Sequence, residues 1–464
     1  MRKLLLLLSI IFFSTNVFAD TMKKDGFLNN KAGYSKDQKI SDPENKILLI
    51  YNHGQKNHDG PSSDCAWKKG MKNISSLVGS LYEKGDIKRD GGFTIFYMGI
   101  NLGAWLAPLL CGYLGSQYGW HYGFGLAGVG MLAGVIVFWD GIKKGVFKEE
   151  GLQPAEYIEK KYFNFNIAQL VYGFAFLIVP VFAYLIILEA GGNSFLGILI
   201  NILVAIAVGY TLLLISQEVK KGNSASAGKL GAILILAVLC AIFWACFEQA
   251  GSSIIVWTDK CINLGFFKDA SMTNAINPGY IIFLAIPFSM LWDKLSVLRR
   301  NPNTPIKFAL GLAFLGLGFL VFAYSINFID GAGKLPLSTL FIGWLLITTG
   351  ELCLSPIGLS KVTQLSPPKL VGFFMGLWFL SSTVAHYIGG MLAKLTTVKG
   401  EETTGLLDKL NNILFRGVDM AGNGVSESMI YNDLFGKIGF VTIAIAIITV
   451  LFSPLIKKLM NDVH

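Results

Sequence analysis

Long apolar stretches separated by short polar segments dominate the chain after residue 90. Ten can be delimited, at about 93–115, 119–140, 165–189, 194–216, 230–257, 277–297, 307–329, 337–360, 371–395 and 435–456. A helix that crosses a bilayer needs about 20 apolar residues. The pattern therefore predicts an all-α polytopic membrane protein with about ten transmembrane helices, and it leaves no room for a second soluble domain after residue 90.

Composition and loop charge agree with this prediction. The chain is 53% hydrophobic and only 15% charged, with a net charge of +9. Nucleic-acid binding is one interpretation of that charge. However, most loop Lys and Arg residues fall on one side of the membrane when the loops alternate from an inside loop at 80–92. Basic residues collect in cytoplasmic loops, so we expect a protein of the cytoplasmic membrane, with both ends of its helical body inside and no nucleic-acid partner.

The first 69 residues follow a different pattern. Residues 1–19 place Arg2 and Lys3 before an apolar run that ends in Val17-Phe18-Ala19. This arrangement is typical of a secretory signal peptide, and an uncleaved anchor is the alternative. Residues 20–69 are too polar to cross a membrane. The moderately apolar segment 70–82 would rise only about 20 Å as a helix, short of the ~30 Å hydrocarbon core.

No catalytic or metal-binding pattern accompanies these segments. The six cysteines are scattered and form no C-x-x-C pair, so neither a zinc site nor a disulfide framework is indicated. An enzyme attached to a membrane tail is a further possibility, but the soluble part lacks a G-x-S-x-G nucleophile elbow. We therefore expect a protein that is not an enzyme and that holds no metal or cofactor.

Two acidic residues, Glu248 and Glu351, lie deep within predicted spans, and the amide of Asn101 lies near the middle of another. Polar and ionisable groups at this depth are costly and usually mark functional sites. Asn101 lies in the uncharged stretch FTIFYMGINLGAWLAPLLCGYLG, among the small residues Gly99, Gly103 and Ala104. Small neighbours allow another helix to approach closely.

The two glutamates share a local design. Ser252 follows Glu248 and Ser355 follows Glu351 by four residues, which one helical turn would place on the same face. Gly251 and Pro356 lie nearby, so each helix is expected to bend there. A carboxyl group in a low-dielectric cavity can hold a proton near neutrality, because desolvation favours its neutral form. Proton transfer is the functional interpretation, and a purely structural tie between helices is the alternative.

Six motifs in order resemble the proton-dependent oligopeptide transporters (the PTR2/POT family) of the major facilitator superfamily. FTIFYMGINLGAW resembles the family's fifth helix and WHYGFGLAGVGM its sixth. FWACFEQAGSS resembles helix seven, INPGYIIFLAIPFSMLW helix eight, GELCLSPIGLSKVTQLSP helix ten and GFFMGLWFLSSTVAHYIGG helix eleven. The resemblance covers about residues 70–460. The spans at 165–189 and 194–216 resemble the helix pair that bacterial members insert between the two six-helix halves.

The resemblance implies import of di- and tripeptides together with protons, and it implies roles for individual residues. Glu248 would take part in proton coupling, and Glu351 would do so while facing the amino end of the peptide. Asn101 would hydrogen-bond the peptide in a wet cavity. Lys72 occupies the position of the family's helix-four lysine, without the proline that usually follows. The cavity lining would further include Asn277, Ser355, Trp378 and Ser382.

The chain also departs from the family pattern. The E-x-x-E-R motif of the first helix is absent, and the resemblance leaves helices one to three and most of helix four unmatched. We expect a partial major facilitator fold, organised as a signal peptide or anchor (1–19), a non-family polar segment (20–69), a remnant of the N-terminal half (70–140), an inserted helix pair (141–229) and a C-terminal six-helix half (230–464). A non-catalytic alternative is a decayed transporter or a partner subunit, and self-association is one way to complete the cavity.

Overall fold

The computed structural model describes residues 88–146, 161–162, 165–190, 195–367, 370–394 and 423–461, together with residues 407 and 410. The chain divides into two compact units, Met1–Ile187 and Leu188–His464. The expected signal peptide, the polar segment 20–69 and Lys72 lie outside the described residues.

The described part of the first unit is built around two helices that pack closely. Helix α6 (Lys88–Tyr118) reaches α7 (Trp120–Lys143) through Gly119, whose φ of 111° suits glycine. A Cβ atom on Gly123 would lie 2.5 Å from the Cys111 carbonyl oxygen, so the contact depends on a small residue. A two-residue antiparallel pair, β1 (Lys161–Tyr162) and β2 (Phe165–Asn166), precedes α9 (Ile167–Ala190).

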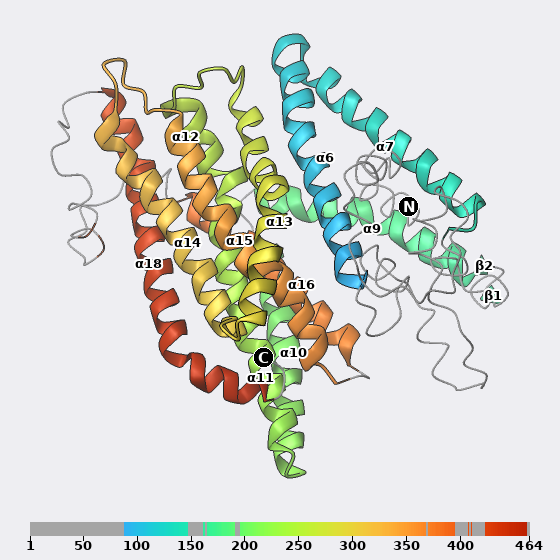
Figure 1. Ribbon diagram of the computed structural model, residues 1–464. Coiled ribbons are helices and arrows are strands. Elements are labelled where there is room, and N and C mark those ends of the chain that lie inside the picture. Colours follow the sequence, from blue (N-terminus) through green and yellow to red (C-terminus); the bar gives the residue numbers. More distant parts are fainter. Residues whose placement is uncertain are drawn as a thin grey trace, which may run out of the picture. The chain divides into compact units, whose positions relative to one another are not determined.

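The second unit is a bundle of long helices (Figure 1). Its elements are α10 (Phe195–Lys220), α11 (Ser224–Phe247), η2 (Glu248–Gly251), α12 (Ser253–Cys261), η3 (Ala270–Ala275), α13 (Ile276–Val297), α14 (Thr304–Tyr324), η4 (Ser325–Phe328), α15 (Ser338–Leu365), α16 (Val371–Lys394) and α18 (Asn423–Met460). Helix α14 packs against both α15 and α18, and α11 packs against α10, α15, α16 and α18.

The helical prediction is confirmed. Among the described residues, nine helical segments are long and apolar enough to cross a membrane. The remaining expected span, at 165–189, coincides with α9, whose apolar stretch Gln169–Leu185 is shorter than the other nine segments. Helix α18 extends beyond its predicted span of 435–456 at both ends, because a helix can continue into polar sequence outside the hydrocarbon layer.

Glycines and aromatic rings fix the core of the second unit. A Cβ atom on Gly316 of α14 would lie 2.9 Å from the carbonyl oxygen of Gly439 on α18. Beyond this contact, Trp257 packs against Phe322 and Phe435 with ring centroids 5.4 and 5.2 Å apart. The Trp257 indole N–H donates to Asn432 Oδ1 at 3.1 Å, and the Asn432 amide donates to the Phe322 carbonyl oxygen at 2.8 Å. The last turn of α14 is thereby tied to α12 and α18.

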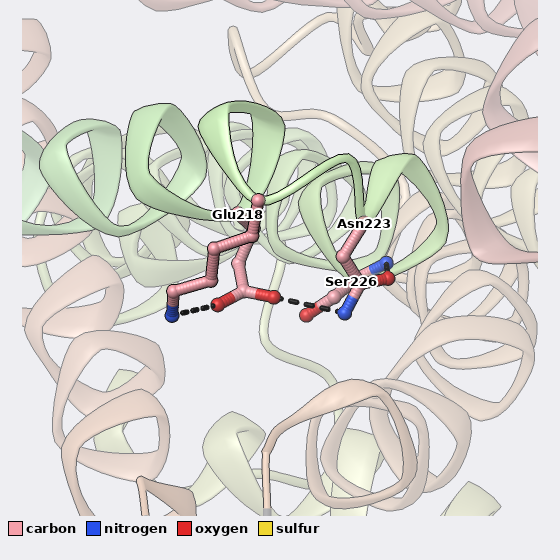
Figure 2. A network of polar contacts seen from close by, with 4 residues as sticks. Glu218, Asn223 and Ser226 are labelled. Atoms are coloured by element: carbon pink, nitrogen blue, oxygen red, sulfur yellow. Dashed lines mark hydrogen bonds and ion pairs between the residues drawn. The ribbon is translucent and has the colours of Figure 1, made fainter.

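A short polar turn joins α10 to α11 (Figure 2). Glu218 accepts from Lys221 Nζ at 2.8 Å and from Asn223 Nδ2 at 2.9 Å. Asn223 also caps α11 by accepting from the Ser226 backbone N–H at 3.2 Å, and Gly222 adopts a φ of 74°. These contacts lie at the end of α10 and the start of α11, and the η2 turn that contains Glu248 follows the opposite end of α11.

Candidate functional site

The span that contains Glu248 is interrupted at that residue. Helix α11 ends at Phe247, a 3₁₀ turn covers Glu248–Gly251, and α12 begins at Ser253 after Ser252 at φ −133° and ψ −95°. The expected bend near Gly251 is therefore confirmed. The expected placement of Ser252 one α-helical turn beyond Glu248 is wrong, because the helix breaks between them. The Ser252 hydroxyl donates to Gln249 Oε1 at 3.4 Å instead.

This break is attached to α16 by two contacts. Gln249 is fully buried, and its amide donates to the Gly389 carbonyl oxygen at 3.0 Å and to the Ala245 carbonyl oxygen at 3.2 Å. The Glu248 carboxylate Oε2 lies 3.6 Å from Nδ1 of His386. The Glu248 side chain keeps 33% of its surface exposed and that of His386 62%. One polar turn thus joins α11 to α16 while its carboxylate stays accessible.

The second glutamate forms a cluster with residues of α13 and α15. The Asn277 amide donates to Glu351 Oε2 at 3.0 Å and to Thr348 Oγ1 at 2.9 Å. Thr348 and Glu351 are three residues apart on α15 and therefore share a face. Glu351 is only 5% exposed. A carboxylate that accepts a hydrogen bond from a neutral amide is held in one orientation without losing its capacity to bind a cation.

The remaining predicted residues lie on α15 and α16. Ser355 is one turn beyond Glu351, and its hydroxyl oxygen is buried with no hydrogen-bond partner among the described residues. A buried polar group without a partner is unusual in a folded protein. Trp378 is buried, and a Cβ atom on Gly358 would lie 2.5 Å from its indole ring, so this glycine allows Trp378 to pack against α15. Ser382 is half-buried one turn further along α16.

The structure brings Asn277 and Glu351 into direct contact and places Ser355 one turn away. It attaches Glu248 to α16, the helix that carries Trp378 and Ser382. Asn101 lies on α6 in the first unit and is buried there. Lys72 lies outside the described residues. The roles that the resemblance implies for these residues remain predictions.

Sequence reasoning missed three polar residues of this region. Thr348 precedes Glu351 by three residues, and His386 follows Ser382 by four residues. Helical spacing from residues already selected was therefore the signal that could have found both of them. Gln249 had no comparable signal, because its contact with Gly389 joins residues far apart in the sequence. In the part of the chain that the structure describes, no group of three or more His, Cys, Asp or Glu side chains could hold a metal ion.

Comparison with known proteins gives consistent matches. Residues 70–407 match the POT family. The chain is 35% identical to "Uncharacterized transporter YclF" of Bacillus subtilis (strain 168), over 84% of this chain and 72% of that protein. It is 32% identical to a di-/tripeptide transporter of Lactococcus lactis subsp. cremoris, over 70% of this chain and 66% of the relative. A crystal structure of peptide transporter POT in complex with sulfate matches with a TM-score of 0.61 and 32% identity, covering 84% of this chain and 73% of that chain.

Proposed function

Because this chain belongs to the POT family of transporters, we propose that it carries di- and tripeptides across the cytoplasmic membrane together with protons. The Lactococcus relative is named for di- and tripeptides, and the solved structure is titled as a peptide transporter. The chain matches 66% of the length of the former and 73% of the latter. Its nine long apolar helical segments among the described residues suit a membrane carrier.

The contact between Asn277 and Glu351 is the observation that carries this proposal. An oligopeptide presents a cationic amino end, and an oriented carboxylate in a low-dielectric site is a suitable partner for it. The Asn277 amide holds the Glu351 carboxylate from α13. The partnerless hydroxyl of Ser355, one turn away, offers a donor and an acceptor to the same ligand.

The other expected residues have complementary roles in this proposal. Trp378 and Ser382 line the path of the peptide from α16, and Asn101 and Lys72 contact its backbone or carboxyl end. Glu248 holds the coupled proton at an interrupted helix. Backbone that departs from helical geometry at membrane depth is tolerated where it is buried in protein or lines a water-filled cavity. The break at Glu248 fits that setting.

Uptake of a labelled dipeptide tests the proposal. The chain is expressed in cells that lack their own peptide transport, and uptake is measured with and without a proton uncoupler. We expect uncoupler-sensitive uptake that falls at least about tenfold in Glu351→Gln, since a charge-assisted contact of about 1.5–3 kcal/mol is lost. Glu218→Gln is the matched control, because Glu218 belongs to the turn between α10 and α11.

Two results would overturn the proposal. The first is background uptake by cells in which the chain is shown to reside in the membrane. The second is uptake that neither the uncoupler nor Glu351→Gln changes, while Glu218→Gln behaves in the same way as the unmodified chain.

A further inference from the structure

A third polar residue continues the stripe of α16 that carries Trp378 and Ser382. His386 follows Ser382 by four residues and Trp378 by eight, and four residues make slightly more than one helical turn. The three side chains therefore lie on one face of α16 within about two turns. The match places the chain in the POT family, but it assigns nothing to this imidazole.

The imidazole lies within a membrane span, about two thirds of the way along α16. Its side chain is 62% exposed within the second unit. Ionisable residues inside spans almost always face the bundle interior or a water-filled cavity, because contact with lipid is costly. The Glu248 carboxylate next to it is itself one-third exposed. Both side chains are thus partly exposed, and the cost of contact with lipid favours a water-filled setting for them.

Glu248 is the charged group that His386 meets. The charged residues on the elements packed against α16 are Glu218 and Lys220 on α10, Lys229 on α11, Glu248 on η2, and Glu351 and Lys361 on α15. Glu218 lies in the turn network near the end of α10, and Glu351 is held by Asn277. The 3.6 Å between His386 Nδ1 and Glu248 Oε2 is longer than a hydrogen bond and is within the range of an ion pair when the imidazole carries a proton.

We propose that His386 is the ionisable partner of Glu248, and that their ion pair transmits the protonation state of Glu248 to the peptide-lining face of α16. The inference rests on the proposed transport function. With Glu248 ionised and the imidazole protonated, the pair attracts η2 to the face that bears Ser382 and Trp378. A proton that arrives on the Glu248 carboxylate removes this attraction. The hydrogen bond from Gln249 to the Gly389 carbonyl oxygen does not depend on that proton, so the backbone stays attached while the side chains separate.

Two transport modes distinguish this role from a structural one. Proteoliposomes that contain the full chain are assayed for dipeptide accumulation driven by an inward proton gradient. They are also assayed for counterflow, in which preloaded unlabelled dipeptide exchanges with labelled dipeptide without a gradient. Exchange needs a folded binding site but no net proton movement. Accumulation needs a folded binding site and also net proton movement.

For His386→Ala we expect accumulation to fall by about tenfold, a typical coupling factor, with counterflow within about twofold of the unmodified chain. His386→Asn keeps a polar group without an ionisable one and should behave in the same way. Glu248→Gln alone should abolish accumulation, because Glu248 holds the coupled proton, and adding His386→Ala to it should cause no further loss, because residues that act as a pair are not additive. Met391→Ala is the control, since this exposed side chain points about 140° away around α16.

The failures are distinguishable. If the unmodified chain shows neither accumulation nor counterflow, the proposed function falls and this inference falls with it. If the unmodified chain accumulates dipeptide and His386→Ala does so equally well, only the role of His386 is overturned. The same holds if His386→Ala reduces both modes equally, or if His386→Asn restores accumulation.

Discussion

The Asn277 side chain allows a quantitative test of how Glu351 is held. Its amide group donates to the Glu351 carboxylate at 3.0 Å and to the Thr348 hydroxyl at 2.9 Å. Asn277→Ala removes both donors and leaves a space next to a carboxylate that is 5% exposed. The bond to the carboxylate is worth about 1.5–3 kcal/mol. If that energy orients Glu351 toward the peptide, half-saturation should require roughly 10–150 times more dipeptide.

The assay is the dependence of initial uptake rate on dipeptide concentration in cells that lack other peptide transport. We expect the half-saturating concentration to rise while the maximal rate changes less, because the amide orients a binding group. Asn263→Ala is the matched control, since Asn263 lies in the exposed loop after α12 and accepts from the Gly265 backbone N–H. A half-saturating concentration for Asn277→Ala within about twofold of the unmodified chain would refute the reasoning.

Two further predictions concern the packing that supports the site. Asn432→Ala removes the acceptor of the Trp257 indole N–H and the donor to the Phe322 carbonyl oxygen. Each buried group left unpaired costs about 1–3 kcal/mol of stability. Thermal unfolding of the purified variant should therefore begin at a lower temperature, and an unchanged unfolding curve would contradict this. Gly350→Ala places a Cβ atom 2.5 Å from the Gly311 carbonyl oxygen, so α14 and α15 must separate at a cost of about 1–3 kcal/mol. Gly376→Ala is its control, because a Cβ atom there meets nothing within 4 Å; equal thermal stability of the two alanine variants would argue against the close contact.

The helices could be predicted from sequence because lipid imposes a simple rule. Each predicted span after residue 90 is helical in the structure, although the span at 230–257 is divided between α11 and α12, since a segment of about 20 apolar residues has few other stable forms in a bilayer. The two carboxylates deep within spans were also visible, because Glu248 and Glu351 contrast with apolar surroundings.

The contacts of those polar residues could not be predicted in the same way. The hydrogen bond from Asn277 to Glu351 joins residues 74 positions apart, and that from Gln249 to Gly389 joins residues 140 apart. Helical periodicity predicts which side chains are neighbours within about two turns of the same helix. It does not predict which helices pack together. The break after Phe247 was foreseen as a bend, but its 3₁₀ geometry depends on tertiary contacts such as that of Gln249 with α16.

The interruption at Glu248–Ser252 also has a mechanical consequence. A continuous α-helix resists bending along its whole length, whereas a 3₁₀ turn has weaker backbone hydrogen bonds and often marks a hinge. Within the interruption Gln249 attaches η2 to α16, and after it Trp257 and Asn432 attach α12 to α18. The backbone from Ala250 to Ser252 lies between these two attachments and will absorb any relative rotation of them. The most compliant stretch of this span therefore begins two residues beyond Glu248.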